Sequence, residues 1–231
     1  MELTPDTTVY WQWQWVTINA TLVNTWIVMA LLAGTSWLVT RRFGLTAPAT
    51  HAQTMLEALV AGVDGQIRAI TQQPTQRLLP FVGTLFLFIA AANLLSIVPG
   101  FRSPTGSLST TAALATCVFL AVPLYGIATR GLGGYLRLYI QPSPFMLPFN
   151  IIGELSRTLA LAVRLFGNIM SGEMIIAILL SIVPLFFPVI MQLLGMLVGV
   201  IQAYIFAVLA TVYIGSATAE KGGKARLKSE D

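Results

Sequence analysis

Charged side chains are scarce in this chain: they make up 10% of its 231 residues, against about 25% in ordinary soluble domains. Apolar residues make up 56%, and the mean hydropathy is +0.78. A surface with so few charges would not stay in solution, so the composition indicates an integral membrane protein. The net charge of +4 is then no sign of nucleic-acid binding. Where the basic residues lie relative to the membrane matters more.

Reactive and metal-binding residues are also few. The single cysteine, Cys117, excludes an intrachain disulfide. The single histidine, His51, lies in an expected surface helix, where an interfacial residue is more common than a ligand. The sequence contains no nucleotide-binding loop, metal-ligand cluster or nucleophile–base pair. We therefore expect no cofactor and no metal, and expect the energy for any work to come from an ion gradient or from another subunit.

Five apolar runs are long enough to cross a bilayer, which needs about 20 residues. The fourth and fifth are longer than a perpendicular crossing requires, so we expect them to be strongly tilted or broken. No internal repeat is present, and we expect a single membrane domain, 1–231, with an N-terminal segment 1–18 and a C-terminal tail 218–231. The five predicted membrane helices are residues 19–40, 78–99, 110–129, 149–183 and 187–217.

Residues 49–72 have a different pattern, in which apolar positions alternate with charged ones at helical spacing. This predicts an amphipathic helix that lies along the membrane surface. Residues 135–150 are a second expected interfacial piece, in which the prolines at 142, 144 and 148 argue against a continuous helix. The predicted fold is therefore an all-α integral membrane protein of about five membrane helices plus an interfacial helix.

The basic residues predict the orientation, since cytoplasmic loops collect Lys and Arg. With the C-terminus in the cytoplasm, ten basic residues lie inside and only Arg102 lies outside, while Arg157 and Arg164 lie within a span. The N-terminus, 1–18, is then external. The ten inside are Arg41, Arg42, Arg68, Arg77, Arg130, Arg137, Lys221, Lys224, Arg226 and Lys228.

Arg164 interrupts an apolar run, "LALAVRLFGNIM". An arginine at the bilayer centre costs from about 2.5 to about 10 kcal/mol or more, so it persists only if it faces protein, water or a partner charge. The plain structural alternative is an ion pair with Glu154 or Glu173. Intramembrane arginines are more often functional than structural, and helical geometry bears on the choice.

At about 100° per residue, Glu173 lies on the opposite side of the helix from Arg164, and Glu154 is almost three turns away. Arg164 is therefore not expected to be neutralised within its own helix, and its partner is best sought on another polypeptide. A cation on one face and a proton-exchanging carboxylate on the other suggest two separate polar environments, as an ion path needs if it must not leak. The residues that share the face of Arg164 are Arg157, Asn168 and Ser171.

Two amides stand out in other spans. In the last span Gly195, Gly199 and Gln202 share a face, and small residues four apart allow helices to approach closely. Packing accounts for the glycines, whereas for Gln202 a functional role and a packing role are equally open. Asn93 lies toward the outer end of its span and is followed by a loop rich in Ser and Thr.

The stretches "RLFGNIMSGEM" and "QAYIFAVLATVYI", together with the upstream "NLLSIVPGFRSPTGSLSTTAALA" and "GELSR", closely resemble subunit a of F-type ATP synthases. The resemblance covers about residues 78–219. It implies a non-catalytic stator subunit that forms two aqueous half-channels and carries H⁺ or Na⁺ to and from the carboxylates of a rotating c ring. It also implies a multi-pass protein of the bacterial inner membrane, with the c ring, b-type peripheral stalk subunits, the rest of the complex and lipid as partners.

The resemblance assigns roles to single residues. Arg164 is similar to the family's essential arginine, which faces the c ring, favours release of its ion and separates the half-channels. Asn168 and Gln202 would lie near that arginine, and Glu173 and Asn93 would line the outer half-channel. The remaining expected ion-path residues are Ser171 and, toward the cytoplasm, Glu154 and Arg157.

Two other readings compete with a rotary stator. A stand-alone cation transporter or antiporter would be favoured by inverted repeats and helices broken at the midplane, and neither is evident in the sequence. A purely structural scaffold would have to explain Arg164, Asn168, Glu173 and Gln202 without a function.

Overall fold

The computed structural model describes residues 9–13, 16–41, 51–71, 77–98, 100–140, 145–183 and 187–218, and most of them are helical. Four helices are long and apolar enough to cross a membrane, and a fifth apolar helix, α3, has 17 residues. The prediction of an all-α membrane protein is therefore confirmed. The helices are α1 (Ala20–Arg41), α2 (His51–Thr71), α3 (Leu79–Leu95), α4 (Leu108–Ile140), α5 (Met146–Ile182) and α6 (Phe187–Thr218).

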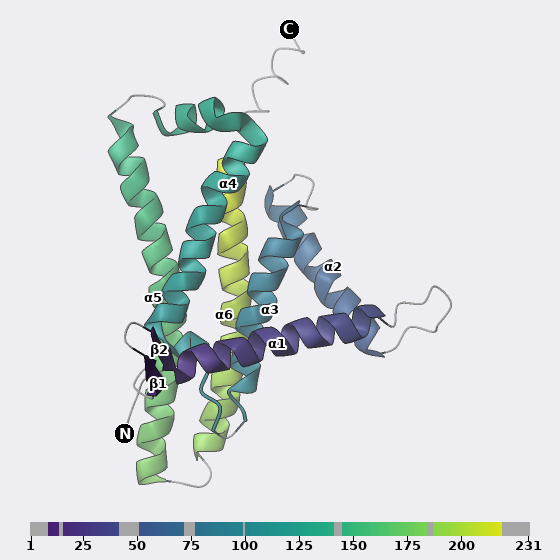
Figure 1. The fold of residues 1–231 in the computed structure, drawn as a ribbon, viewed down its shortest axis with the longest axis vertical. Helices are drawn as coiled ribbons and strands as arrows, with labels where there is room; N and C mark the ends of the chain where they lie inside the picture. The colour runs from purple at the N-terminus through teal and green to yellow at the C-terminus, as the bar shows by residue number, and fades with distance from the viewer. Residues whose placement is uncertain are drawn as a thin grey trace.

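Helices α3, α4, α5 and α6 run beside one another as a bundle, and α1 crosses it (Figure 1). The 37 residues of α5 and the 32 of α6 give lengths of about 55 and about 48 Å. The hydrocarbon core of a bilayer is only about 30 Å thick. Neither helix fits upright, so both must lie strongly tilted. The 22 residues of α1, about 33 Å long, match the core thickness.

The bundle is held together on the inner side of α6. Ala203, Ala207 and Ala210 are buried there at helical spacing, which lets neighbouring helices approach closely. Phe206, only 1% exposed, fills the space between them and the facing side chains of α3, α4 and α5. Dispersion between such closely packed groups is the main attraction when lipid replaces water outside.

Helix α2 has the predicted amphipathic character. Ile67 is 1% exposed and packs with Val82 of α3 and Ile214 of α6. On its outer side Arg68 pairs with Asp64 at 2.8 Å, one turn away. The helix slants from the far end of α1 to the start of α3 (Figure 1).

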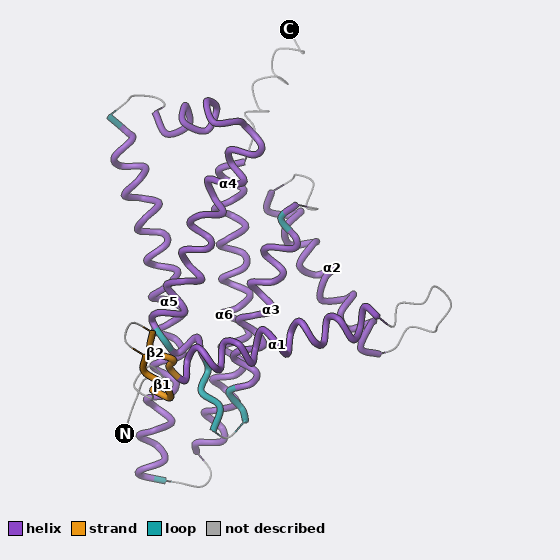
Figure 2. The backbone as a smooth tube through the Cα atoms, in the orientation of Figure 1, coloured by secondary structure: helices purple, strands orange, loops and turns teal. Residues whose placement is uncertain are grey.

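The chain departs from the all-helical prediction near its start. A short antiparallel hairpin is formed by β1 (Val9–Trp13) and β2 (Val16–Asn19), and β2 contacts α1, which follows it directly (Figure 2). The alternation "WQWQW" has the two-residue period of a strand. The expected N-terminal segment 1–18 is thus partly a hairpin.

Two predicted spans have different ends. The span predicted at 78–99 ends as a helix at Leu95, because residues 96–98 turn back on themselves. The span predicted at 110–129 begins at Leu108 and ends close to its predicted end, because Gly131 has φ 73° and ψ 163°, which are not helical; a second helical segment follows up to Ile140. After Gly131 this segment runs across the end of the bundle toward the start of α5 (Figure 1), and Tyr135 packs back against the core cluster that contains Val122 and Ala217. Pro142, Pro144 and the predicted tail beyond Thr218 lie outside the described residues.

A buried connection joins α3 to α4. Its turn, Pro104–Gly106, is buried, and Ser103, Thr105 and Ser107 are at most 1% exposed. The turn contacts α1, α3, α4 and α5. A loop that lies inside a helical bundle must have its polar groups satisfied by neighbours, and the site depends on how this is done.

Candidate functional site

Helix α5 has one buried side and one open side at its middle. Leu161, Ala162 and Leu165 are buried in the bundle core. Arg164 is exposed on the other side. Within the part of the chain that the structure describes, no ion pair joins Arg164 to a carboxylate. The geometry agrees with the prediction that its own helix does not neutralise it.

A hollow of about 660 Å³ lies beyond Arg164 toward the end of α5; we call it the Glu173 hollow. Its walls come from α3, the α3–α4 connection, α5 and the first half of α6. Two charged side chains line it, the acidic Glu173 and the basic Arg102. The predicted ion-path residues that line this hollow are Asn93, Asn168, Ser171 and Glu173.

One wall of the Glu173 hollow is held by side-chain amides from three helices. Asn24 of α1 donates a hydrogen bond to the carbonyl oxygen of Arg102 at 2.9 Å. Gln192 of α6 donates to the carbonyl oxygen of Ser96 at 3.0 Å. Asn93 of α3 holds the middle of the connection. The wall is therefore built by hydrogen bonds between elements far apart in sequence.

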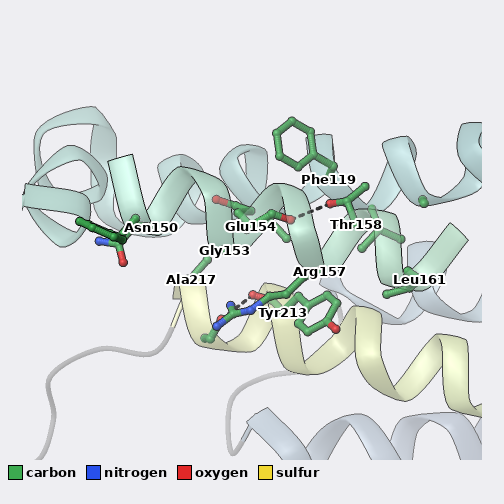
Figure 3. A pocket seen from close by; sticks show the side chains of 14 residues that line it. Phe119, Asn150, Gly153, Glu154, Arg157, Thr158, Leu161, Tyr213 and Ala217 are labelled. Atoms are coloured by element: carbon green, nitrogen blue, oxygen red, sulfur yellow. Dashed lines mark hydrogen bonds between the residues drawn. The ribbon is translucent and has the colours of Figure 1, made fainter. Parts of the chain in front are cut away.

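A second hollow, of about 440 Å³, lies at the beginning of α5; we call it the Glu154 hollow. It is formed by α4, α5 and the last turns of α6. The guanidinium carbon of Arg157 lies 5.7 Å from the ring centroid of Tyr213, a cation–π distance. Figure 3 shows Arg157 reaching across to α6, with Glu154 and Thr158 on the same helix. The Thr158 hydroxyl donates to the carbonyl oxygen of Glu154 at 3.0 Å.

The two hollows have no lining residue in common. Along α5 the Glu154 hollow uses residues between Phe149 and Leu161, and the Glu173 hollow uses residues between Asn168 and Leu180. Arg164 lies between these two stretches and lines neither hollow. The two hollows thus lie toward opposite ends of α5, with Arg164 between them.

Gln202 is placed differently from the other predicted residues. It is 7% exposed on the packed side of α6 and lines neither hollow. No hydrogen bond joins it to Arg164 in the described part of the chain. On the exposed side of α5, the Ser171 hydroxyl donates to the carbonyl oxygen of Asn168 at 3.0 Å, within its own helix.

Several site residues were not selected from the sequence. Arg102 had a signal, since it is the one basic residue on the predicted outer side. Gln192 is an amide in a long apolar helix, which is the kind of residue that usually has a partner. Asn24 and Tyr213 had no sequence signal, because their roles depend on contacts with distant elements.

Known proteins similar to this chain share one description. The family model for the ATP synthase A chain matches residues 22–215. A protein of Acaryochloris marina, "ATP synthase subunit a 2", is 60% identical over 94% of this chain and 93% of its own length. One of Crocosphaera subtropica, "ATP synthase subunit a 1", is 59% identical over 94% of both chains.

A more distant relative is aligned along the whole chain. "ATP synthase subunit a" of Nitrosospira multiformis is 49% identical over all of this chain and 92% of its own length. The match therefore includes α1, the buried connection and both hollows. Together with its helices long and apolar enough to span a bilayer, this makes the chain a multi-pass membrane protein. The chain belongs to the ATP synthase subunit a family.

Proposed function

We propose that this chain is the ion-conducting stator subunit of a rotary ATP synthase. The Glu173 hollow takes up the ion from outside, and the Glu154 hollow releases it into the cytoplasm when the complex makes ATP. Between them the ion travels on a carboxylate of a rotating ring of c subunits. The observation that carries the proposal is the exposed Arg164, which has no ion pair among the described residues and lies between two hollows that share no lining residue.

Arg164 supplies a fixed charge in this mechanism. A guanidinium stays protonated, so it attracts an arriving ring carboxylate in its ionised form and favours release of the ion. Because Arg164 cannot hand on a proton, ions cannot pass directly from one hollow to the other. Transfer then requires the ring to turn, which couples ion flow to rotation. Each charge that crosses is worth about 2.3 kcal/mol per 100 mV.

The proposed orientation has the N-terminus outside and the C-terminus in the cytoplasm. Arg77, just before α3, Arg130, next to the bend of α4, and Arg137, in the last turn of α4, then lie on the inner side. The α3–α4 connection with Arg102 lies on the outer side. The Glu173 hollow then faces the outside and the Glu154 hollow faces the cytoplasm. The membrane in this proposal is the inner membrane of a bacterium.

The proposed partners follow from the open side of α5. Leu155, Leu159 and Val163 are exposed on the same helix as Arg164, between 52% and 58%, and an arginine beside them needs a facing group other than lipid. The c ring supplies that group, and b-type stalk subunits hold this chain against the turning ring. ATP chemistry belongs to other subunits of the complex. Membership of the family does not favour a stand-alone cation transporter.

The test is Arg164→Ala in the complete complex, reconstituted into vesicles. We expect ATP-driven ion pumping to fall by more than about a hundredfold, the size of effect reached when a preorganised charge is removed. Assembly should persist, because Arg164 makes no ion pair with any residue that the structure describes. Normal coupled pumping by this variant would contradict the proposed role.

Arg68→Ala is the matched control. Arg68 is also an exposed arginine, but it lies on α2 and pairs with Asp64 on the outer side of that helix. An exposed pair of this kind contributes little. Pumping by Arg68→Ala within about twofold of the parent complex is expected. If only Arg164→Ala loses pumping, the loss is due to the position of Arg164 and not to the removal of a positive charge in general.

A further inference from the structure

Asn93 uses both ends of its side-chain amide within the protein. It is 2% exposed, near the end of α3. Its Nδ2 donates to the carbonyl oxygen of Gly199 on α6 at 2.9 Å. Its Oδ1 accepts a hydrogen bond from the Thr105 hydroxyl at 2.9 Å, and Ser103 lies at 3.4 Å. An amide engaged in this way has little capacity left to bind a passing ion.

The contact with α6 depends on a glycine. A Cβ on Gly199 would lie 2.9 to 3.0 Å from the Cβ, Cγ and Nδ2 atoms of Asn93. Such distances are too short for any side chain at that position. The bare backbone of Gly199 therefore lets Asn93 reach a carbonyl group of the facing helix. Gly195, by contrast, has open space where its Cβ would be.

Thr105 continues the chain of contacts toward Glu173. Its hydroxyl also lies 2.6 Å from that of Ser103, so both hydroxyls and Asn93 form one buried network. The next residue, Gly106, lies directly against α5. A Cβ on Gly106 would be 3.2 Å from Oε1 of Glu173 and 3.3 Å from a methyl group of Ile169. The turn thus bounds the space in which the Glu173 carboxyl group lies.

We propose that Asn93 and Thr105 are positioning residues that fix the Pro104–Gly106 turn as a wall beside Glu173, and that Gly106 leaves the space for its carboxyl group. This rests on the proposed function, in which Glu173 takes up the ion. It also changes the role expected for Asn93 from the family resemblance. Asn93 acts through the turn and not by contact with the ion.

The first experiment separates the effect of the Thr105 hydroxyl group from the effect of the size of the side chain. Thr105→Val removes the hydroxyl and keeps the size, whereas Thr105→Ser keeps the hydroxyl. Loss of a buried hydrogen bond should lower the pumping rate per assembled complex by about fivefold to tenfold in Thr105→Val. Thr105→Ser should stay within about twofold of the parent. If Thr105→Ser is as slow as Thr105→Val, the hydroxyl is not what matters and the proposal is overturned.

The second experiment asks whether Asn93 and Thr105 act as a unit. Asn93→Leu should be as slow as Thr105→Val or slower, because it also loses the contact with α6. In the double variant the two losses should not multiply, since either one already frees the turn. A double variant as slow as the product of the two single losses would show independent roles and would overturn the proposal.

The third experiment tests the contact with Glu173 by compensation. Gly106→Ala should slow pumping by about threefold, because the new methyl group must displace the carboxyl group. Glu173→Asp shortens that side chain, so Gly106→Ala should cost less than about 1.5-fold in the Glu173→Asp background. Gly83→Ala is the control, because a Cβ at this position of α3 would have open space around it. It should leave the pumping rate unchanged. An equal loss from Gly106→Ala in both backgrounds contradicts the proposal.

The outcomes distinguish this proposal from the one it rests on. If Arg164→Ala pumps normally, the proposed function is wrong and the position of Glu173 has no bearing on transport. If Arg164→Ala is inactive while Thr105→Ser gives no rescue and Gly106→Ala is not compensated, the function stands and only the positioning role is wrong.

Discussion

The two ends of α5 form hollows of different construction. The Glu173 hollow has a wall of irregular backbone, which amides from α1, α3 and α6 hold in place. The Glu154 hollow is lined by residues of α4, α5 and α6, and the Arg157 guanidinium lies over the Tyr213 ring beside it. Hydrogen bonds between elements hold irregular backbone at one end, whereas a cation–π contact joins α5 to α6 at the other.

The difference teaches where precision is needed. A carboxyl group that takes up an ion must have a constant distance to its neighbours. Non-helical backbone inside a membrane protein is tolerated only where its N–H and C=O groups find partners in the protein or in a water-filled cavity. The Pro104–Gly106 turn meets that condition. A release path needs only an open polar route with the correct sign of charge. The predictions below test whether the two ends differ as this account requires.

Removal of the two carboxyl groups should give the largest difference. Glu173→Gln cannot exchange a proton, and a positioned proton-transfer group contributes about a hundredfold or more to a rate. Glu154→Gln should lower the pumping rate by about tenfold or less, because the release path needs only an open polar route and no carboxyl group at a fixed distance. Rates of ATP-driven pumping per assembled complex compare them. A Glu154→Gln variant slower than Glu173→Gln would reverse the assignment of the two hollows.

The Arg157–Tyr213 stack should have an intermediate effect. A partly exposed cation–π contact is worth about 0.5 to 1 kcal/mol, so Tyr213→Leu should lower the pumping rate by about threefold to fivefold. Tyr213→Phe retains the ring and should stay near the parent rate. Initial rates in vesicles measure both. If Tyr213→Phe is as slow as Tyr213→Leu, the hydroxyl and not the stack is used at this end.

Ser171 should give the smallest effect. Its hydroxyl donates to the carbonyl oxygen of Asn168 in its own helix and lies on the exposed side. Ser171→Ala should therefore remain within about twofold of the parent in the same assay, since a surface hydroxyl with a local partner contributes little. A tenfold loss would show that Ser171 contacts the ion directly, and the Glu173 hollow would need another description.

Much of the fold could be predicted because the membrane imposes simple rules. Apolar runs of about 20 residues or more are visible in the sequence, and the long runs of α5 and α6 already require tilt. The second helical segment, from Gly131 to Ile140, was not predicted, because the prolines that follow it argue against a continuous helix in residues 135–150. The hairpin before α1 was not predicted, although the alternation in "WQWQW" has the period of a strand.

The site was predictable to the extent that one helix contains it. The separation of Arg164 from Glu173 and Glu154 follows from helical periodicity alone. The bond from Asn93 to Gly199 joins residues 106 positions apart, and no pattern along the chain marks it. Gly195 and Gly199 had the same signal for close packing, yet only Gly199 has a close neighbour. Periodicity gives the face of a helix and not its partner.

The central claim is that two separate half-channels open to opposite sides of the membrane. Single cysteines can test it in a Cys117→Ser background, because Cys117 is exposed and would react itself. Ser171→Cys labels the Glu173 hollow and Thr158→Cys the Glu154 hollow. A membrane-impermeant thiol reagent is added to one side of oriented vesicles at a time. The account predicts that Ser171→Cys reacts only from outside and Thr158→Cys only from the cytoplasmic side. Reaction of both cysteines from the same side would contradict it.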